Sequence, residues 1–157
     1  MIRTQPDATE VRGIVLPVGA ADLLLPSAAV AEIVRYRDPT PFSSAPQWLL
    51  GAVTWRDHAV PLVSVAAQGG EPGAITPGLR ARMVVCFTPN GNPKLPYVGI
   101  LAVGVPRLAR FRTEALVPTE TVPENLFVLH ALTFADRPAW IPDMHAIERS
   151  VLKALQA

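Results

Sequence analysis

Prolines are spread along the whole of this sequence and limit the length of every helix or strand that it can form. The 157 residues include 17 prolines, where average usage would give roughly eight. Proline fixes φ and lacks a backbone N–H, so it interrupts helices and avoids the middle of sheets. The chain is therefore expected to form short strands, and the predicted strands that contain Pro61 and Pro138 are expected at sheet edges or bulges.

Composition narrows the class further. Half of the residues are hydrophobic, which is enough for a core in a single domain of this size. The chain has fourteen basic and thirteen acidic residues, and its net charge of +1 does not favour binding to nucleic acid or to an anionic membrane. The single cysteine, Cys86, excludes an internal disulfide. With a polar, flexible segment expected at 1–10 and no membrane-length apolar run, the sequence indicates a soluble cytoplasmic protein without direct membrane insertion.

One order of predicted elements occurs twice. We expect the same elements in subdomain one, about 11–66, and in subdomain two, about 81–141. In each, two strands joined by a turn are followed by a strand of alternating polar and apolar residues, a loop and a hairpin. The glycine- and proline-rich stretch at about 67–80 is interpreted as the linker between them. A short helix is expected to start at Pro46 and to end at Gly51. The pattern predicts an all-β protein with little helix.

The last segment has a different period. Asp143 is a suitable N-cap for a C-terminal helix over about 143–155. Apolar residues recur in it at three- and four-residue spacings: Met144, Ile147, Val151, Leu152 and Leu155. We expect this face to pack onto a sheet.

Residues suited to catalysis are few. The histidines His58, His130 and His145 have no metal-ligand spacing, and no phosphate-binding loop is present. Cys86 lies among apolar neighbours and is interpreted as a buried, inert thiol, and His130 as a hydrogen-bonded structural histidine. The sequence thus predicts no catalytic, cofactor or metal site, and a protein that is not an enzyme.

Large side chains next to charges remain as candidates for a protein interface. Trp55 precedes Arg56 at the tip of a predicted hairpin, and arginine and tryptophan are enriched in interface hot spots. The pattern leaves open whether Trp55 belongs to the core or to an interface.

Several segments, in order, resemble the CheW-like family of bacterial chemosensory adaptors. Val30–Arg35 is similar to its V-x-E-I segment, and Ala45–Arg56 to its P-x-x-hydrophobic-x-G-hydrophobic-x-N-L-R-G segment. Val60–Val63 is similar to V-x-P-hydrophobic-hydrophobic-D-L, and Tyr97–Val105 to the hydrophobic-G-hydrophobic-x-V-D-x-V strand. The resemblance spans nearly the whole chain, so 11–157 is expected to be one CheW-like domain.

The resemblance implies two packed five-stranded SH3-like β-barrels and no enzyme activity or cofactor. It implies two partners, the cytoplasmic tip of a chemoreceptor and the regulatory domain of a CheA-type histidine kinase, in arrays at membrane-bound receptors. By the match, Val30, Glu32 and Val34 fall in a partner-binding segment, and Trp55 and Arg56 at the hairpin tip. The alternative from another class is a small-ligand binder or enzyme that uses a cleft between the barrels near His130 or Cys86.

The sequence differs from the family pattern at several positions. Asp57 follows the arginine where the family has glycine, Ser64 replaces an aspartate after the proline strand, and Gly104 replaces the aspartate of the second barrel. Asp57 is expected to lie beside Arg56 and to neutralise it. These changes indicate a divergent, accessory member of a type IV pilus or other alternative chemosensory system, and they leave retention of kinase binding open.

Overall fold

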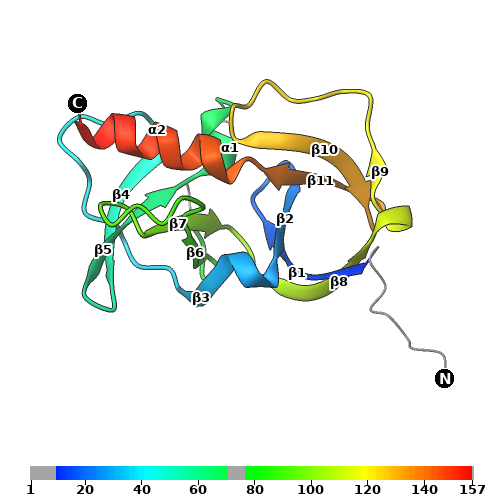
Figure 1. The fold of residues 1–157 in the computed structure, drawn as a ribbon, viewed down its shortest axis with the longest axis horizontal. Helices are drawn as coiled ribbons and strands as arrows, with labels where there is room; N and C mark the ends of the chain where they lie inside the picture. Colours follow the sequence, from blue (N-terminus) through cyan, green and yellow to red (C-terminus); the bar gives the residue numbers. More distant parts are fainter. Residues whose placement is uncertain (1–9, 71–76, 157) are drawn as a thin grey trace.

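Short strands form two sheets (Figure 1). The computed structural model describes residues 10–70 and 77–156. We call the sheet built from residues 30–102 the central sheet; its strands, in spatial order, are β3 (Val30–Arg35), β6 (Arg82–Phe87), β7 (Tyr97–Ala102), β5 (His58–Val63) and β4 (Leu49–Trp55). We call the other the terminal sheet; its strands, in spatial order, are β8 (Arg107–Arg112), β1 (Glu10–Pro17), β2 (Asp22–Pro26), β11 (Arg137–Pro142), β10 (Val128–Phe134) and β9 (Val117–Pro118).

The two sheets share one topology. In each, one hairpin, β6–β7 or β1–β2, pairs in parallel with a second hairpin, β5–β4 or β11–β10. A further strand, β3 or β8, pairs antiparallel with the first hairpin and lies at the edge. The predicted β-rich fold class and the repeated order of elements are therefore confirmed. The described part of the central sheet has the expected five strands, whereas the terminal sheet has β9 as a sixth.

The predicted division into two consecutive subdomains is wrong. Residues 67–80 connect β5 to β6 inside the central sheet, although 71–76 lie outside the described residues. The chain passes between the sheets in the 3-10 turn η1 (Ser27–Ala29) and again in residues 103–106. The central sheet is thus inserted between two parts of the terminal sheet. Residues 1–9 of the predicted flexible segment also lie outside the description, and Glu10 begins β1.

The prolines inside strands do not mark edge strands. Pro61 lies in β5 and Pro138 in β11, and both strands have a neighbour on each side. Each parallel pairing, however, begins after the proline, at Leu62 in β5 and at Ala139 in β11. Each proline therefore lies outside the parallel ladder, where its missing N–H removes no hydrogen bond to the parallel neighbour, so both are tolerated within a sheet.

The short helix predicted to start at Pro46 is not present. Strand β4 begins at Leu49, and Gly51 lies at a bulge within it with a φ of +143°. A side chain at Gly51 would collide with the carbonyl of Thr40. Glycine is therefore needed at this position because two backbone segments lie close together, and not because a helix ends there. The short helix is α1 (Val65–Gln68), whose N-cap Ser64 accepts a hydrogen bond from the Ala67 N–H at 3.1 Å.

The main core lies between the sheets. It contains side chains from both sheets and from α2 (Met144–Gln156), with Leu16, Ile100 and Ile147 fully buried. Smaller clusters lie within each sheet, around Met83 in the central sheet and around Val15 in the terminal sheet. A continuous apolar core of this kind makes the two sheets one folding unit.

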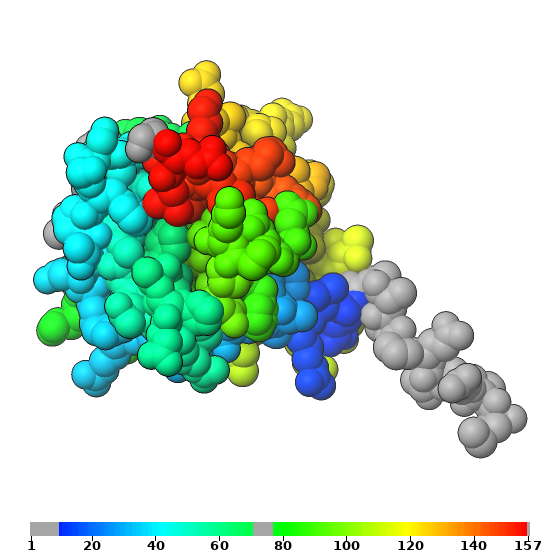
Figure 2. Space-filling model, turned by 60° about the vertical axis from the view of Figure 1, so that its left-hand side comes forward, coloured from blue at the N-terminus to red at the C-terminus, as the bar shows by residue number. Residues whose placement is uncertain are grey.

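The C-terminal helix forms as predicted. The Asp143 side chain accepts a hydrogen bond from the Ala146 N–H at 3.0 Å, which satisfies a free donor of the first turn. Ile147 and Val151 are buried in the main core, whereas Leu155 is exposed. Glu148 is also buried, and its Oε2 accepts a hydrogen bond from Asn90 Nδ2 at 2.5 Å. This contact joins α2 (red) to the turn between β6 and β7 (green) in Figure 2.

Candidate docking surface

The β4–β5 hairpin ends in a turn of two residues that both have left-handed backbone conformations. Arg56 and Asp57 have φ values of 44° and 64°, and Trp55 and His58 form the closing pair. Two positive φ values are characteristic of the type I′ turn, whose twist matches that of a hairpin. The predicted hairpin is confirmed, and its turn places Arg56 at the tip.

Glu32 of β3 contacts this tip. Its Oε1 accepts a hydrogen bond from Trp55 Nε1 at 3.1 Å. The same oxygen lies 3.0 Å from Arg56 Nη2, with which it forms an ion pair. The Arg56 guanidinium carbon also lies 4.9 Å from the centre of the Trp55 ring. Strands β3 and β4 are the two edge strands of the central sheet, so these contacts connect its two edges. Arg37 adds a hydrogen bond to the Thr54 carbonyl.

The three residues differ in exposure. The side chains of Arg56 and Glu32 are 69% and 39% exposed, whereas Trp55 as a residue is only 7% exposed. The Trp55 ring packs edge-on against Tyr97, with 4.9 Å between ring centres. Trp55 therefore belongs to the core, which resolves the alternative left open by the sequence. It supports a charged pair that faces solvent.

Val30 and Val34 lie elsewhere on β3. Val34 packs against the core cluster of the central sheet, and Val30 against the main core. Ile33, which the sequence did not single out, is the exposed apolar residue of this strand. A bulge between Val30 and Glu32 shifts the alternation of the strand by one residue. Because a bulge has no simple sequence signal, the pattern could not show which apolar side chain faces outward.

The three departures from the family pattern have local explanations. Glu32, rather than the predicted Asp57, forms the ion pair with Arg56. Ser64 caps α1. Gly104 lies where the chain returns to the terminal sheet, and a Cβ there would lie 3.2 Å from Pro17.

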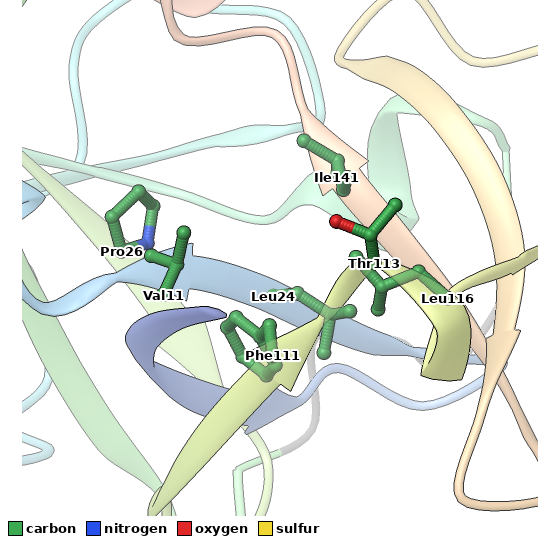
Figure 3. A pocket seen from close by; sticks show the side chains of 7 residues that line it. All are labelled: Val11, Leu24, Pro26, Phe111, Thr113, Leu116 and Ile141. Carbon is green, nitrogen blue, oxygen red and sulfur yellow. The ribbon is translucent and has the colours of Figure 1, made fainter. Parts of the chain in front are cut away.

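The groups considered for catalysis are not brought together in a cleft between the sheets. Cys86 is fully buried, and burial raises the pKa of its thiol from 9.0 to about 12. His130 is exposed on β10, so its interpretation as a buried structural histidine is wrong. A cavity of about 220 Å³ lies in the terminal sheet, not between the sheets (Figure 3). Its lining is apolar except for Thr113: Val11, Leu24, Pro26, Phe111, Thr113, Leu116 and Ile141.

The described residues contain neither a metal-binding cluster nor a membrane-spanning helix. Within 10–70 and 77–156, no cluster of three or more histidine, cysteine or acidic side chains is placed to hold a metal ion. None of the helices described is long and apolar enough to cross a membrane.

The fold and the surface define a β-rich, two-sheet module with an exposed charged tip, a class suited to protein binding. The family model for the CheW-like domain matches residues 12–151. The chain therefore belongs to the CheW-like family of chemotaxis scaffold and adaptor proteins.

A solved structure shows the same fold. The scaffolding protein TtCheW from Thermoanaerobacter tengcongensis superposes with a TM-score of 0.70 at 17% sequence identity, over 86% of this chain and 90% of that chain. No curated protein matches the sequence.

Proposed function

We propose that this protein is a non-catalytic adaptor that couples the cytoplasmic tips of chemoreceptors to the regulatory domain of a CheA-type histidine kinase. Membership of the CheW-like family supports a role as a chemosensory adaptor. The observation that carries the proposal is the exposed Glu32–Arg56 pair, held at the rim of the central sheet by a buried tryptophan.

The geometry of this pair suits recognition better than stability. An ion pair between exposed side chains contributes only about 0–1 kcal/mol to folding. When a partner covers it, the local dielectric falls and its charges discriminate more strongly between partners. Trp55 and the two-residue turn fix Arg56 before binding, so little conformational entropy remains to be lost. Exposed Ile33 supplies apolar area on the same strand.

The position in the cell and the signalling system follow from the same proposal. We assign the protein to the cytoplasmic side of membrane-bound receptor arrays, in an alternative system such as that of a type IV pilus. The small-ligand alternative gains no support from the described residues, because core side chains occupy the space between the sheets and Cys86 is among them.

Binding of the purified full chain to a receptor cytoplasmic tip and to a CheA-type regulatory domain from its own genome tests the proposal. We expect Arg56→Glu to weaken binding by about tenfold or more, through repulsion from Glu32 and loss of a charge at the interface. Arg149→Glu, an exposed change on α2, is the matched control and is expected to bind normally.

A charge swap separates the structural from the recognition role of the pair. The double variant Glu32→Arg with Arg56→Glu restores opposite charges but removes the acceptor of the Trp55 Nε1 hydrogen bond. Its thermal unfolding is therefore measured beside its binding, with Glu32→Gln, which keeps an acceptor, as the control for that bond. If the double variant also restores binding, the pair is structural only. If the wild type binds neither partner, the adaptor proposal fails.

A further inference from the structure

Strand β8 is the edge of the terminal sheet opposite to β9. It pairs with β1 along its whole length, from Glu10 opposite Arg112 to Val15 opposite Arg107. Among the described residues, no strand pairs with its other side. An edge strand presents backbone N–H and C=O groups on which another extended chain can add.

This edge is strongly basic. We call Arg12 of β1 and Arg107, Arg110 and Arg112 of β8 the basic strip. Glu10 contacts two of them, Arg110 at 3.3 Å and Arg112 at 3.4 Å. Within the described residues, Arg12 and Arg107 form no ion pair. On the face that Arg110 and Arg112 share with their pairing partners Arg12 and Glu10, three arginines and one glutamate leave a formal charge of +2, although the whole chain carries only +1. Arg107 lies on the opposite face and adds a fourth arginine at the start of β8.

An apolar side chain and a groove accompany the charges. Leu108 is 82% exposed in the middle of the basic strip. A groove of about 560 Å³ runs beside it, lined by Arg12, Gly13, Ser27, Leu108, Ala109 and Arg110. An exposed leucine between arginines offers both apolar contact and charge to one partner, the combination found at protein interfaces.

The opposite face of β8 holds the strand in place. Phe111 is buried and packs edge-on against Phe134, with 5.2 Å between ring centres. Figure 3 shows Phe111 beside Leu24 and Val11 on this inner side. The edge is therefore ordered before any partner arrives, which lowers the entropic cost of strand addition.

The edge strand of the other sheet is different. The side chains of Glu32 in β3 and of Arg37, just after β3, contact the end of β4 and its turn, so that edge is partly covered by its own sheet. Phe111 of β8 packs against Phe134 of β10, but within the described residues no side-chain hydrogen bond or ion pair joins β8 to β9 or β10. The asymmetry between the two edges singles out β8.

We propose that β8 binds an extended acidic segment of a partner protein as an added antiparallel strand. Alternate residues of a strand share one face, so Leu108, Arg110 and Arg112 point the same way. An antiparallel strand would place a first acidic residue opposite Arg112, a second opposite Arg110 and an apolar residue opposite Leu108. The expected sequence is therefore Glu-x-Glu-x-Leu. This surface is separate from the Glu32–Arg56 surface.

A labelled synthetic peptide containing Glu-Thr-Glu-Thr-Leu, titrated into the full chain at low salt, tests the proposal by fluorescence anisotropy. We expect saturable binding that weakens as salt rises. Arg110→Glu is expected to weaken it about tenfold, whereas Arg35→Glu on the other edge strand is the matched control and leaves it unchanged. Arg56→Glu also leaves it unchanged, so failure here is distinct from failure of the adaptor proposal.

Two further measurements identify strand addition itself. A peptide methylated at the backbone nitrogens that face β8 is expected to lose binding, and bound peptide is expected to slow hydrogen exchange of the β8 amides. A peptide with the reversed sequence Leu-Thr-Glu-Thr-Glu is expected to bind more weakly.

Two results of the peptide titrations would overturn the proposal. They are absence of peptide binding up to about 1 mM, and binding that survives both backbone methylation and Arg110→Glu. Binding of vesicles containing anionic lipid without peptide binding would assign the strip to a membrane. Self-association that Arg110→Glu abolishes, again without peptide binding, would assign it to a second copy of this chain.

Discussion

The tips of the β4–β5 and β10–β11 hairpins have the same backbone geometry and use arginine in different ways. Both turns contain two residues of positive φ, Arg56 and Asp57 in one, and Ala135 and Asp136 at 52° and 62° in the other. At the β10–β11 tip, Arg137 Nε lies 3.0 Å from Oδ2 of Asp22, whose side chain is only 4% exposed. At the β4–β5 tip, Arg56 pairs with the partly exposed Glu32.

The difference shows how one topology serves two purposes. Asp22 lies in β2 and pairs in parallel with Ala139 of β11, so the Arg137–Asp22 pair fastens the parallel strands of the terminal sheet. A buried carboxylate needs its partner, because an unpaired buried charge is costly. The exposed pair of the central sheet carries no such cost and is available for recognition.

Removing the buried pair's arginine is expected to have the largest effect on stability. Arg137→Ala leaves the Asp22 carboxylate buried without its ion-pair partner, and we expect it to lower the free energy of unfolding by about 2–3 kcal/mol. We expect a smaller loss than for a fully buried ion pair because Arg137 is itself partly exposed. Urea denaturation measures the change. A loss as small as that of Arg56→Ala would show that the two tips are equivalent.

Alkaline pH is expected to destabilise the core between the sheets through Cys86. Its pKa is about 12 when folded and 9.0 when exposed, so its contribution is complete below pH 9 and is lost between pH 9 and 12. From near pH 8 to about pH 10.5, the wild type should lose about 2 kcal/mol more than Cys86→Ala. Parallel denaturation of both proteins checks this. Equal losses would mean that the thiol ionises while the protein is folded.

The turn residues of the two tips are expected to respond differently to glycine. Alanine is strained at positive φ, so Ala135→Gly should raise stability by about 1 kcal/mol. Asp57→Gly restores the family residue, but aspartate tolerates this conformation better, so the gain should be smaller. Thermal unfolding ranks the two variants, and the reverse order would contradict this interpretation of the turns.

Removing the exposed arginine is expected to change stability least. Arg56→Ala breaks a pair in solvent and should cost at most about 0.5–1 kcal/mol. Its circular dichroism melt should nearly overlay that of the wild type while partner binding falls. A large loss of stability would instead place Arg56 with Arg137 as a structural residue.

Sequence patterns predicted the strands and the C-terminal helix well, but they predicted poorly which of these elements contact one another. Alternation and turn residues located the hairpins and the C-terminal helix, because these depend on neighbours along the chain. The same signals placed a helix before Gly51, where contact with Thr40 decides the backbone conformation. For the candidate surface, Glu32, Trp55 and Arg56 were predicted from two segments, but their contact and the exposure of Ile33 were not.

The sequence by itself determined short strands, the repeated order of elements and membership of a family, because prolines, turns and apolar periodicity act locally. Only the tertiary structure decided which hairpin joins which sheet, because that pairing depends on contacts between segments far apart in the sequence, such as β2 with β11. It also decided which arginine is used for stability and which is exposed. That choice depends on the burial of the opposing carboxylate, Asp22 or Glu32, which lies far from its partner in sequence.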